Sequence, residues 1–194
     1  MRPSSLAEVA GQSHLLGEGK PLRQVLEGGQ LHSMILWGPP GSGKTTLARL
    51  LAQHAGAELL TLSAVTSGVQ DIRKSVSTAT ALRESGKQAL LFVDEVHRFN
   101  KAQQDDFLQH IENGVIVFVG ATTENPAFEI NNALLSRSRV YLLKPVDSEA
   151  IASLVRRALE DQDRGLGRLA LKMDDEAIEF LSLAGAGDAR RALG

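Results

Sequence analysis

Short apolar runs alternate with longer amphipathic segments along the chain as far as Pro145. Each run is four to six residues long, which suits a strand that is buried on both faces of a sheet. The segments between the runs carry apolar residues three or four positions apart, as at Val69, Ile72 and Val76, a spacing typical of helices. This alternation predicts an α/β fold, a five-stranded parallel sheet with helices on both faces. The expected strands cover residues 34–37, 57–62, 89–93, 115–120 and 140–144.

The pattern changes after Pro145, where strand-like runs stop and only helical spacing remains. Residues 151–159 and 177–184 each place apolar side chains along one helical face. A further helix is expected to begin at Asp188 and to be cut short at Gly194. We therefore expect an α/β domain followed by a small, partial, all-helical module. The expected domains are residues 1–146 and residues 147–194.

Composition and charge narrow the classes of protein that the chain can represent. The net charge is -2 and the pI is about 6.2, so no general basic field draws the chain onto nucleic acid or an anionic membrane, and any DNA contact needs a local basic patch. The absence of cysteine from the sequence excludes a disulfide framework, and the five histidines lack the spacing of metal ligands. No apolar run has the length of a signal peptide or a membrane span, so we expect a cytoplasmic protein without a membrane contact.

The segment GPPGSGKT, residues 38–45, lies between a predicted strand and a predicted helix, which is the context of a phosphate-binding loop. Its glycines let backbone N–H groups converge on phosphate oxygens, while Lys44 offers a positive charge and Thr45 a hydroxyl for Mg²⁺. The alternative is a glycine-rich turn that binds no ligand. The expected nucleotide-binding residues are Gly38, Pro39, Pro40, Gly41, Ser42, Gly43, Lys44, Thr45 and Thr46.

Polar residues follow the next two buried strands along the chain. Asp94 and Glu95 end one of them, which fits a division of labour in which Asp94 holds the water shell of Mg²⁺ and Glu95 polarises an attacking water. A phosphotransferase would present an acceptor alcohol instead, and a polar strand end without chemistry is the simplest alternative. Thr122 and Thr123 end the other strand, and their hydroxyls can reach the γ-phosphate because the carboxyl ends of parallel strands share one edge of the sheet.

Two pairs of arginines lie near the ends of predicted elements. Arg137 and Arg139 precede and begin the last expected strand. Arg190 and Arg191 fall in the first turn of a helix that Asp188 would cap, where positive charge opposes the helix macrodipole by a few tenths of a kcal/mol or more. When each pair is taken alone, ordinary solvated charge at the end of an element explains it at least as well as a functional role does.

The order of these motifs resembles that of the AAA+ ATPases, and most closely their clamp-loader branch. The order is a phosphate loop, an Asp-Glu strand, a Thr-Thr strand, an arginine before the fifth strand, and a helical lid with Gly-Asp-x-Arg. The stretches HRFNKAQQD, TTENPAFEINNALLSR and GDARRAL further resemble the Werner-helicase-interacting protein family and its bacterial members. The resemblance covers essentially the whole chain. It implies that the C-terminal part of the lid and a tetramerisation region lie beyond this sequence.

The resemblance implies roles for the residues of the loop and the acidic strand end. Lys44 and Thr45 would bind the phosphates of ATP, and Thr45 and Asp94 would hold Mg²⁺. Glu95 would activate the water, and the segment 8–12, EVAGQ, would lie against the adenine.

The resemblance also implies roles for the remaining polar residues. Thr123 would be the first sensor of the γ-phosphate, with Thr122 as the alternative, and Arg190 the second sensor, reaching in from the lid. Arg137 matches the arginine that a clamp-loader subunit gives to the active site of its neighbour. A serine follows it where clamp loaders have cysteine, and Arg139 comes next, so the choice between the two arginines stays open.

The implied function is ATP hydrolysis that acts on DNA at stalled or damaged replication forks, in replication-associated recombination and repair. The implied partners are DNA ends or single-strand/duplex junctions, single-strand binding protein, the replication machinery and further copies in a tetramer, at the nucleoid. The alternatives are a nucleotide-gated module that recruits replication partners, and a subunit of a clamp loader or a branch-migration motor. Candidate DNA contacts, which also fit ordinary solvated helix charges, are Arg73, Lys74, Arg98 and Lys101.

Overall fold

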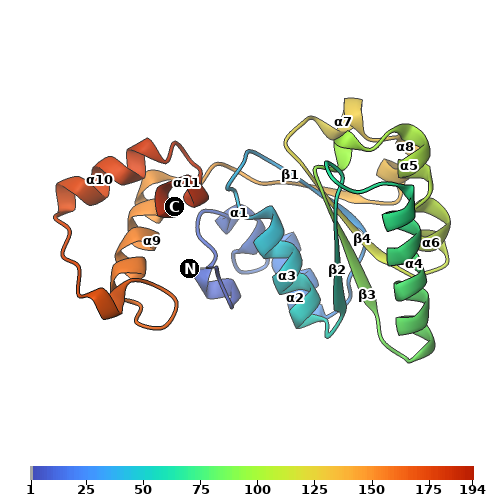
Figure 1. Cartoon of the computed structure of the whole chain (residues 1–194), viewed down its shortest axis with the longest axis horizontal. Helices are drawn as coiled ribbons and strands as arrows, with labels where there is room; N and C mark the ends of the chain where they lie inside the picture. The colour runs from blue at the N-terminus through green and yellow to red at the C-terminus, as the bar shows by residue number, and fades with distance from the viewer. Residues whose placement is uncertain (1) are drawn as a thin grey trace.

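The computed structural model describes residues 2–194 and contains a five-stranded, wholly parallel sheet (Figure 1). The strand order is β2-β3-β4-β1-β5, so β1, which leads into the glycine-rich loop, lies between β4 and β5. The expected α/β fold with five parallel strands is thereby confirmed. The strands are β1 (Met34–Trp37), β2 (Glu58–Ser63), β3 (Ala89–Asp94), β4 (Val117–Thr122) and β5 (Arg139–Leu142).

Two strands differ from the expectation by two residues: β4 runs from Val117 to Thr122 rather than over 115–120, and β5 ends at Leu142 rather than Lys144. The backbone N–H groups of Val115 and Ile116 both donate to the carbonyl of His110, at 2.9 and 3.3 Å. These two residues therefore complete the turn after the preceding helix before the ladder with β3 begins. Apolar residues occur both in such a turn and in a strand, so apolar character alone could not locate the start of β4.

Helices cover both faces of the sheet because alternate strand residues point to opposite sides. Met34 and Leu36 pack against one set of helices on one face of the sheet, whereas Ile35 packs against a second set on the other face. Figure 1 shows α2 and α3 on one side of the sheet and α4, α5, α6 and α8 on the other. The first set is α1 (Ser13–Leu16), α2 (Pro21–Gly28) and α3 (Lys44–His54); the second runs along the chain as α4 (Val69–Glu84), α5 (Lys101–Asp105), α6 (Leu108–Glu112), α7 (Pro126–Glu129) and α8 (Asn132–Ser136).

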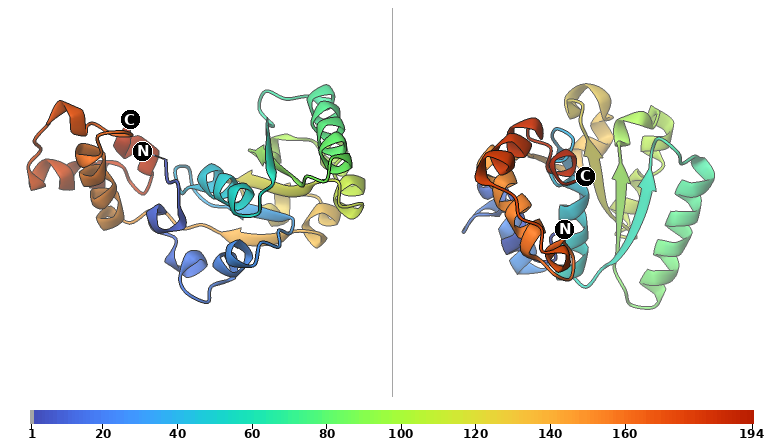
Figure 2. Two further views of the ribbon diagram at one scale, coloured as in Figure 1. Left: turned by 90° about the horizontal axis from the view of Figure 1, so that it is seen from below. Right: turned by 60° about the vertical axis from the view of Figure 1, so that its left-hand side comes forward.

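The last part of the chain forms a separate helical layer, the lid, which projects from the α1–α3 side of the sheet (Figures 1 and 2). It has its own small apolar core of Val146, Ile151, Val155 and Ile178. The boundary at residue 146 stays a prediction. Every helix within residues 2–194 is too short or too polar to cross a bilayer. The lid contains α9 (Ser148–Glu160), the 3-10 helix η3 (Gly167–Leu169), α10 (Asp175–Ala184) and α11 (Ala189–Leu193); two further 3-10 turns are η1 (Leu6–Glu8) and η2 (Val96–Arg98).

Candidate functional site

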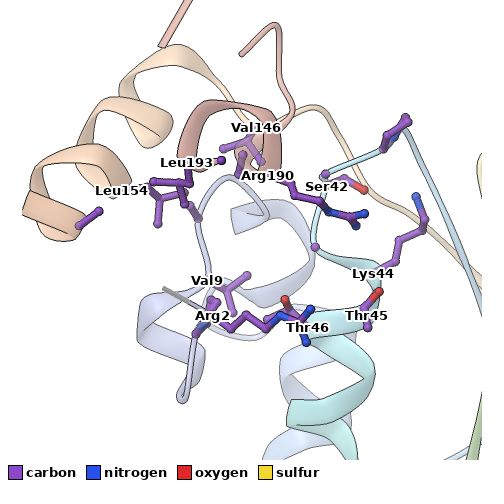
Figure 3. Close-up of a pocket in the computed structure, with 18 of the residues that line it drawn as sticks. Arg2, Val9, Ser42, Lys44, Thr45, Thr46, Val146, Leu154, Arg190 and Leu193 are labelled. Carbon is purple, nitrogen blue, oxygen red and sulfur yellow. The ribbon is translucent and has the colours of Figure 1, made fainter. Parts of the chain in front are cut away.

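A cavity of about 600 Å³ lies where the carboxyl edge of the sheet, the N-terminal segment and the lid meet (Figure 3). The strand order creates it, since β1 lies beside β4 and β4 beside β3. The backbone N–H of Gly38 donates to the carbonyl of Thr122 at 3.1 Å, which fixes the start of the loop to the end of β4. The predicted site residues that line this cavity are Pro40, Gly41, Ser42, Gly43, Lys44, Thr45, Thr46, Asp94, Glu95 and Arg190.

The loop between β1 and α3 depends on glycine at two positions of positive φ. Gly41 has φ +70° and Gly43 has φ +99°, a region that other residues adopt at a cost. Gly41 also packs directly against Asp188 of the lid, so that even a methyl group there would collide with the Asp188 carboxylate. Ser42 closes the turn by donating its hydroxyl to the Pro39 carbonyl at 2.8 Å. The loop is thus compact and in contact with the lid.

Lys44 opens α3 and folds its side chain back over the loop. Its ammonium group donates to the carbonyls of Gly38 and Pro39 at 2.7 and 2.9 Å, and the residue is 8% exposed. Burial lowers the pKa of Lys44, while the carboxylates of Glu95 and Asp94 favour its charged form. A phosphate group entering the loop would offer this ammonium a partner of opposite charge in place of two neutral carbonyls.

The two acidic residues occupy the end of β3 and the turn that follows it. Asp94 is the last residue of the strand, and Glu95 has φ 53° and ψ 44° at the start of η2. A glutamate in this left-handed region is uncommon, and such strain persists where the surroundings hold it. Both side chains line the cavity beside Lys44 and Thr45.

The two threonines at the end of β4 differ in their surroundings. Thr122 is fully buried, and its hydroxyl accepts a hydrogen bond from the Glu124 N–H at 3.0 Å. Thr123 is half-buried and begins the loop after the strand. Neither belongs to the cavity lining, and the carbonyl of Thr122 accepts the hydrogen bond from Gly38 at the start of the loop.

The lid brings one of the predicted arginines to the cavity. The Asp188 carboxylate accepts hydrogen bonds from the N–H groups of Arg190 and Arg191 at 2.8 and 3.1 Å, which confirms that Asp188 caps this helix. Figure 3 shows the side chain of Arg190 extending from the lid toward Ser42 of the loop. The guanidinium group therefore faces the position that phosphates would occupy.

The other predicted arginine lies outside the cavity lining. Arg137 ends α8, donates through Nε to the Glu112 carboxylate at 2.6 Å, and donates through Nη1 to the Ala133 carbonyl at 2.8 Å. Arg139 begins β5 and is exposed, with its backbone N–H donating to the Ser33 carbonyl at 3.0 Å. Both arginines are thus surface residues of this chain, and their roles stay predictions.

The N-terminal segment contributes in a way that the sequence pattern did not indicate. Val9 and Ala10 of the segment 8–12 line the cavity, and the contact of this segment with adenine stays a prediction. Gln12 is 1% exposed, and its amide donates to the carbonyls of Lys144 and Ser42 at 2.8 and 3.3 Å while accepting from the Lys144 N–H at 3.1 Å. One buried side chain therefore ties the N-terminal segment to the loop and to the linker of the lid.

The family described as "ATPase family associated with various cellular activities (AAA)" matches residues 34–146. The chain belongs to the AAA family. This match covers the sheet, the loop and both acidic residues. Membership of the family indicates that this chain binds a nucleotide. The resemblance to AAA+ ATPases that the motif order indicated is confirmed.

Curated relatives match over the whole of this chain. Replication-associated recombination protein A of Escherichia coli (strain K12) is 56% identical over 193 residues, which is 100% of this chain and 43% of that protein. ATPase WRNIP1 of Dictyostelium discoideum is 44% identical over 193 residues, 100% of this chain and 22% of that protein. The chain thus spans less than half the length of these AAA relatives.

Among solved structures, the Thermotoga maritima RuvB Holliday junction branch migration motor is similar with a TM-score of 0.80 and 26% identity. The similarity covers 99% of this chain and 62% of that one. It therefore extends through both the sheet and the helical layer that follows it.

Proposed function

We propose that this chain forms the nucleotide-binding core and part of the lid of an ATP hydrolase. The observation that carries the proposal is the convergence of Lys44, Asp94, Glu95 and Arg190 on one cavity, from a loop, a strand end and the lid. The charges of these groups suit hydrolysis of a phosphoanhydride. The cations Lys44 and Arg190 would face the phosphates, and the carboxylates of Asp94 and Glu95 would face the metal and the water. The name of the relative ATPase WRNIP1 supports the same chemistry.

Mg²⁺ fits the residues of this cavity. The Thr45 hydroxyl and the Asp94 carboxylate supply oxygen ligands, and both line the cavity beside Lys44. Within residues 2–194 no group of three His, Cys, Asp or Glu side chains could hold a metal ion alone, which suits an ion that takes its other ligands from water and phosphate. When bound, Mg²⁺ would neutralise charge on the phosphates.

Side chains of this chain would perform the other steps of hydrolysis. Glu95 would accept a proton from the attacking water, and Thr123 would contact the γ-phosphate. Thr123 is preferred over Thr122 because the Thr122 hydroxyl is buried and engaged with Glu124. Arg190 would stabilise the charge on the phosphates from the lid, so that closing the lid would complete the site.

We further propose that the protein works on DNA at stalled or damaged replication forks, in recombination and repair. The name replication-associated recombination protein A supports a role in recombination linked to replication. DNA ends or single-strand/duplex junctions, single-strand binding protein and other replication proteins would be its partners in the cytoplasm, at the nucleoid. In a tetramer, Arg137 would reach the active site of the adjoining copy, and its exposed position at the end of α8 is compatible with that role.

The test of hydrolysis is Glu95→Gln in the complete protein that carries this chain. The substitution keeps the size of the side chain and removes its basicity, so ATP affinity should stay unchanged while turnover falls about 10²- to 10⁴-fold. Phosphate release and binding of a fluorescent ATP analogue would be measured side by side. An unchanged rate of phosphate release would exclude Glu95 as the base and, with it, the proposed site.

A branch-migration motor is the second candidate, and the likeness to the RuvB motor over 99% of this chain favours it. Such a motor would share the ATP chemistry and differ in its DNA substrate. Turnover stimulated by four-way junctions far more than by gapped or forked DNA would favour the motor, and the reverse order would favour action at forks.

A further inference from the structure

His97 lies between the ends of the two strands that carry the proposed catalytic groups. It is the central residue of η2, which directly follows Glu95, and its side chain is 9% exposed. Its Nδ1 atom lies 2.9 Å from Thr122 Oγ1 and 3.4 Å from Glu95 Oε2. One ring nitrogen therefore touches the last residue of β4 and the carboxylate that follows β3.

The partners of His97 determine which of its atoms carries the proton. An ionised carboxylate only accepts hydrogen bonds, so the contact with Glu95 is favourable when Nδ1 is protonated. The Thr122 hydroxyl is suited to the same arrangement, because it accepts from the Glu124 N–H at 3.0 Å and can donate to the Glu124 carbonyl at 3.3 Å. Its second lone pair is then left for the N–H of His97. With this tautomer, the Nδ1–H group would donate to Thr122 and lie 3.4 Å from the Glu95 carboxylate.

The conformation and the exposure of Glu95 explain why its carboxylate needs a neighbour that fixes its direction. With φ 53°, Glu95 occupies a region that non-glycine residues adopt only where neighbouring groups hold them. The side chain is 31% exposed, so packing alone does not hold the carboxylate in one direction. A catalytic base contributes fully only when it is held within hydrogen-bond reach of the proton that it accepts.

We propose that His97 is a positioning residue that aims the Glu95 carboxylate at the attacking water and couples it to the end of β4. The inference rests on the proposed function, in which Glu95 is the base. Thr123, the proposed γ-phosphate contact, is covalently next to Thr122, so a shift of this loop reaches Glu95 through the Thr122–His97 contact. His97 thereby links the presence of a γ-phosphate to the readiness of the base.

The test compares His97→Asn with His97→Gln in the complete protein. The asparagine amide can place an N–H near the position of Nδ1, whereas the longer glutamine places it near the position of Nε2. We expect H97N to retain kcat within about threefold and H97Q to lower kcat about ten- to hundredfold, the scale that a small misplacement of a catalytic group produces. The KM for ATP should stay unchanged in both variants. His110→Ala, on α6, is the control for loss of a histidine.

A double-mutant cycle with Thr122→Val tests the coupling. Since His97 and Thr122 are expected to act through one contact, adding T122V to H97Q should lower kcat by less than the product of the two single effects. Equal kcat for H97N and H97Q, a change in KM alone, or fully multiplicative effects would each overturn the inference. If Glu95→Gln kept its turnover, the proposed function itself would fail, which separates the two outcomes.

Discussion

The buried amide of Gln12 leads to a quantitative prediction for the stability of the fold. Replacing it with leucine keeps the approximate volume of the side chain and removes three hydrogen bonds, to Lys144 N–H, Lys144 carbonyl and Ser42 carbonyl. Leaving a buried polar group without a partner costs about 1–3 kcal/mol. The two Lys144 groups are only partly buried and the Ser42 contact is long at 3.3 Å, so we take the low end for each. The free energy of unfolding should fall by about 2–3 kcal/mol.

Urea denaturation followed by circular dichroism would measure the change. For a domain of this size, about 2–3 kcal/mol corresponds to a fall in Tm of about 4–12 °C. Gln24→Leu is the matched control, because Gln24 is exposed and its side chain donates to the Gly19 carbonyl alone, at 3.3 Å. It should change stability by less than about 0.5 kcal/mol. A loss below about 1 kcal/mol for Gln12→Leu, or one equal to the control, would refute the reasoning.

Three further experiments test other parts of the structure. Phe107→Ala empties a fully buried position in the core between the sheet and the second set of helices, and it should lower the free energy of unfolding by about 3–5 kcal/mol in urea titrations. Hydrogen bonds from Arg164 and from Ser4 lower the pKa of Glu8 from its ordinary value of 4.5 to about 2. The stability contributed by Glu8 is therefore complete above about pH 4.5 and lost as the pH falls through about 2, and Glu8→Gln should flatten the dependence of the urea midpoint on pH in that window. Arg137→Ala should lower ATP turnover of the assembled protein about a thousandfold or more with ATP binding intact, whereas Arg139→Ala should leave turnover nearly unchanged, and the opposite result would assign the role to Arg139.

The central strands β1, β3 and β4 were predictable because they are largely apolar runs, as burial on both faces of a parallel sheet requires. The edge strands β2 and β5 are more exposed than expected and are recognisable only from their leucine, valine and tyrosine residues. The short helices between β3 and β5 were not predictable, since each has only four or five residues and shows no complete apolar face. Several are set by side-chain caps instead. Asn100, Asn125 and Asn131 accept hydrogen bonds from the N–H groups at the starts of α5, α7 and α8. An isolated asparagine is too common in loops for such a cap to be predicted with its helix.

The loop over residues 38–45 was predictable because its residues act together within one short segment. Gln12 and His97 were missed for the opposite reason. Gln12 bonds to a residue 132 positions away, and His97 contacts one 25 positions away. The segments that contain them, EVAGQ and HRFNKAQQD, are part of the family resemblance, but nothing in either segment indicates which distant residue the side chain contacts. Their importance follows only from the strand order, which brings distant segments to one edge of the sheet.

The contact between Gly41 and Asp188 limits how freely the parts of this protein can be exchanged. Asp188 begins the last helix of the lid and occupies the space that a side chain at Gly41 would need. A chimaera that takes its lid from a distant homologue would therefore inherit a mismatch at this point unless the incoming helix begins with a residue of similar size. Natural or engineered recombination between such genes should join most smoothly when the loop and the first turn of that helix come from the same parent.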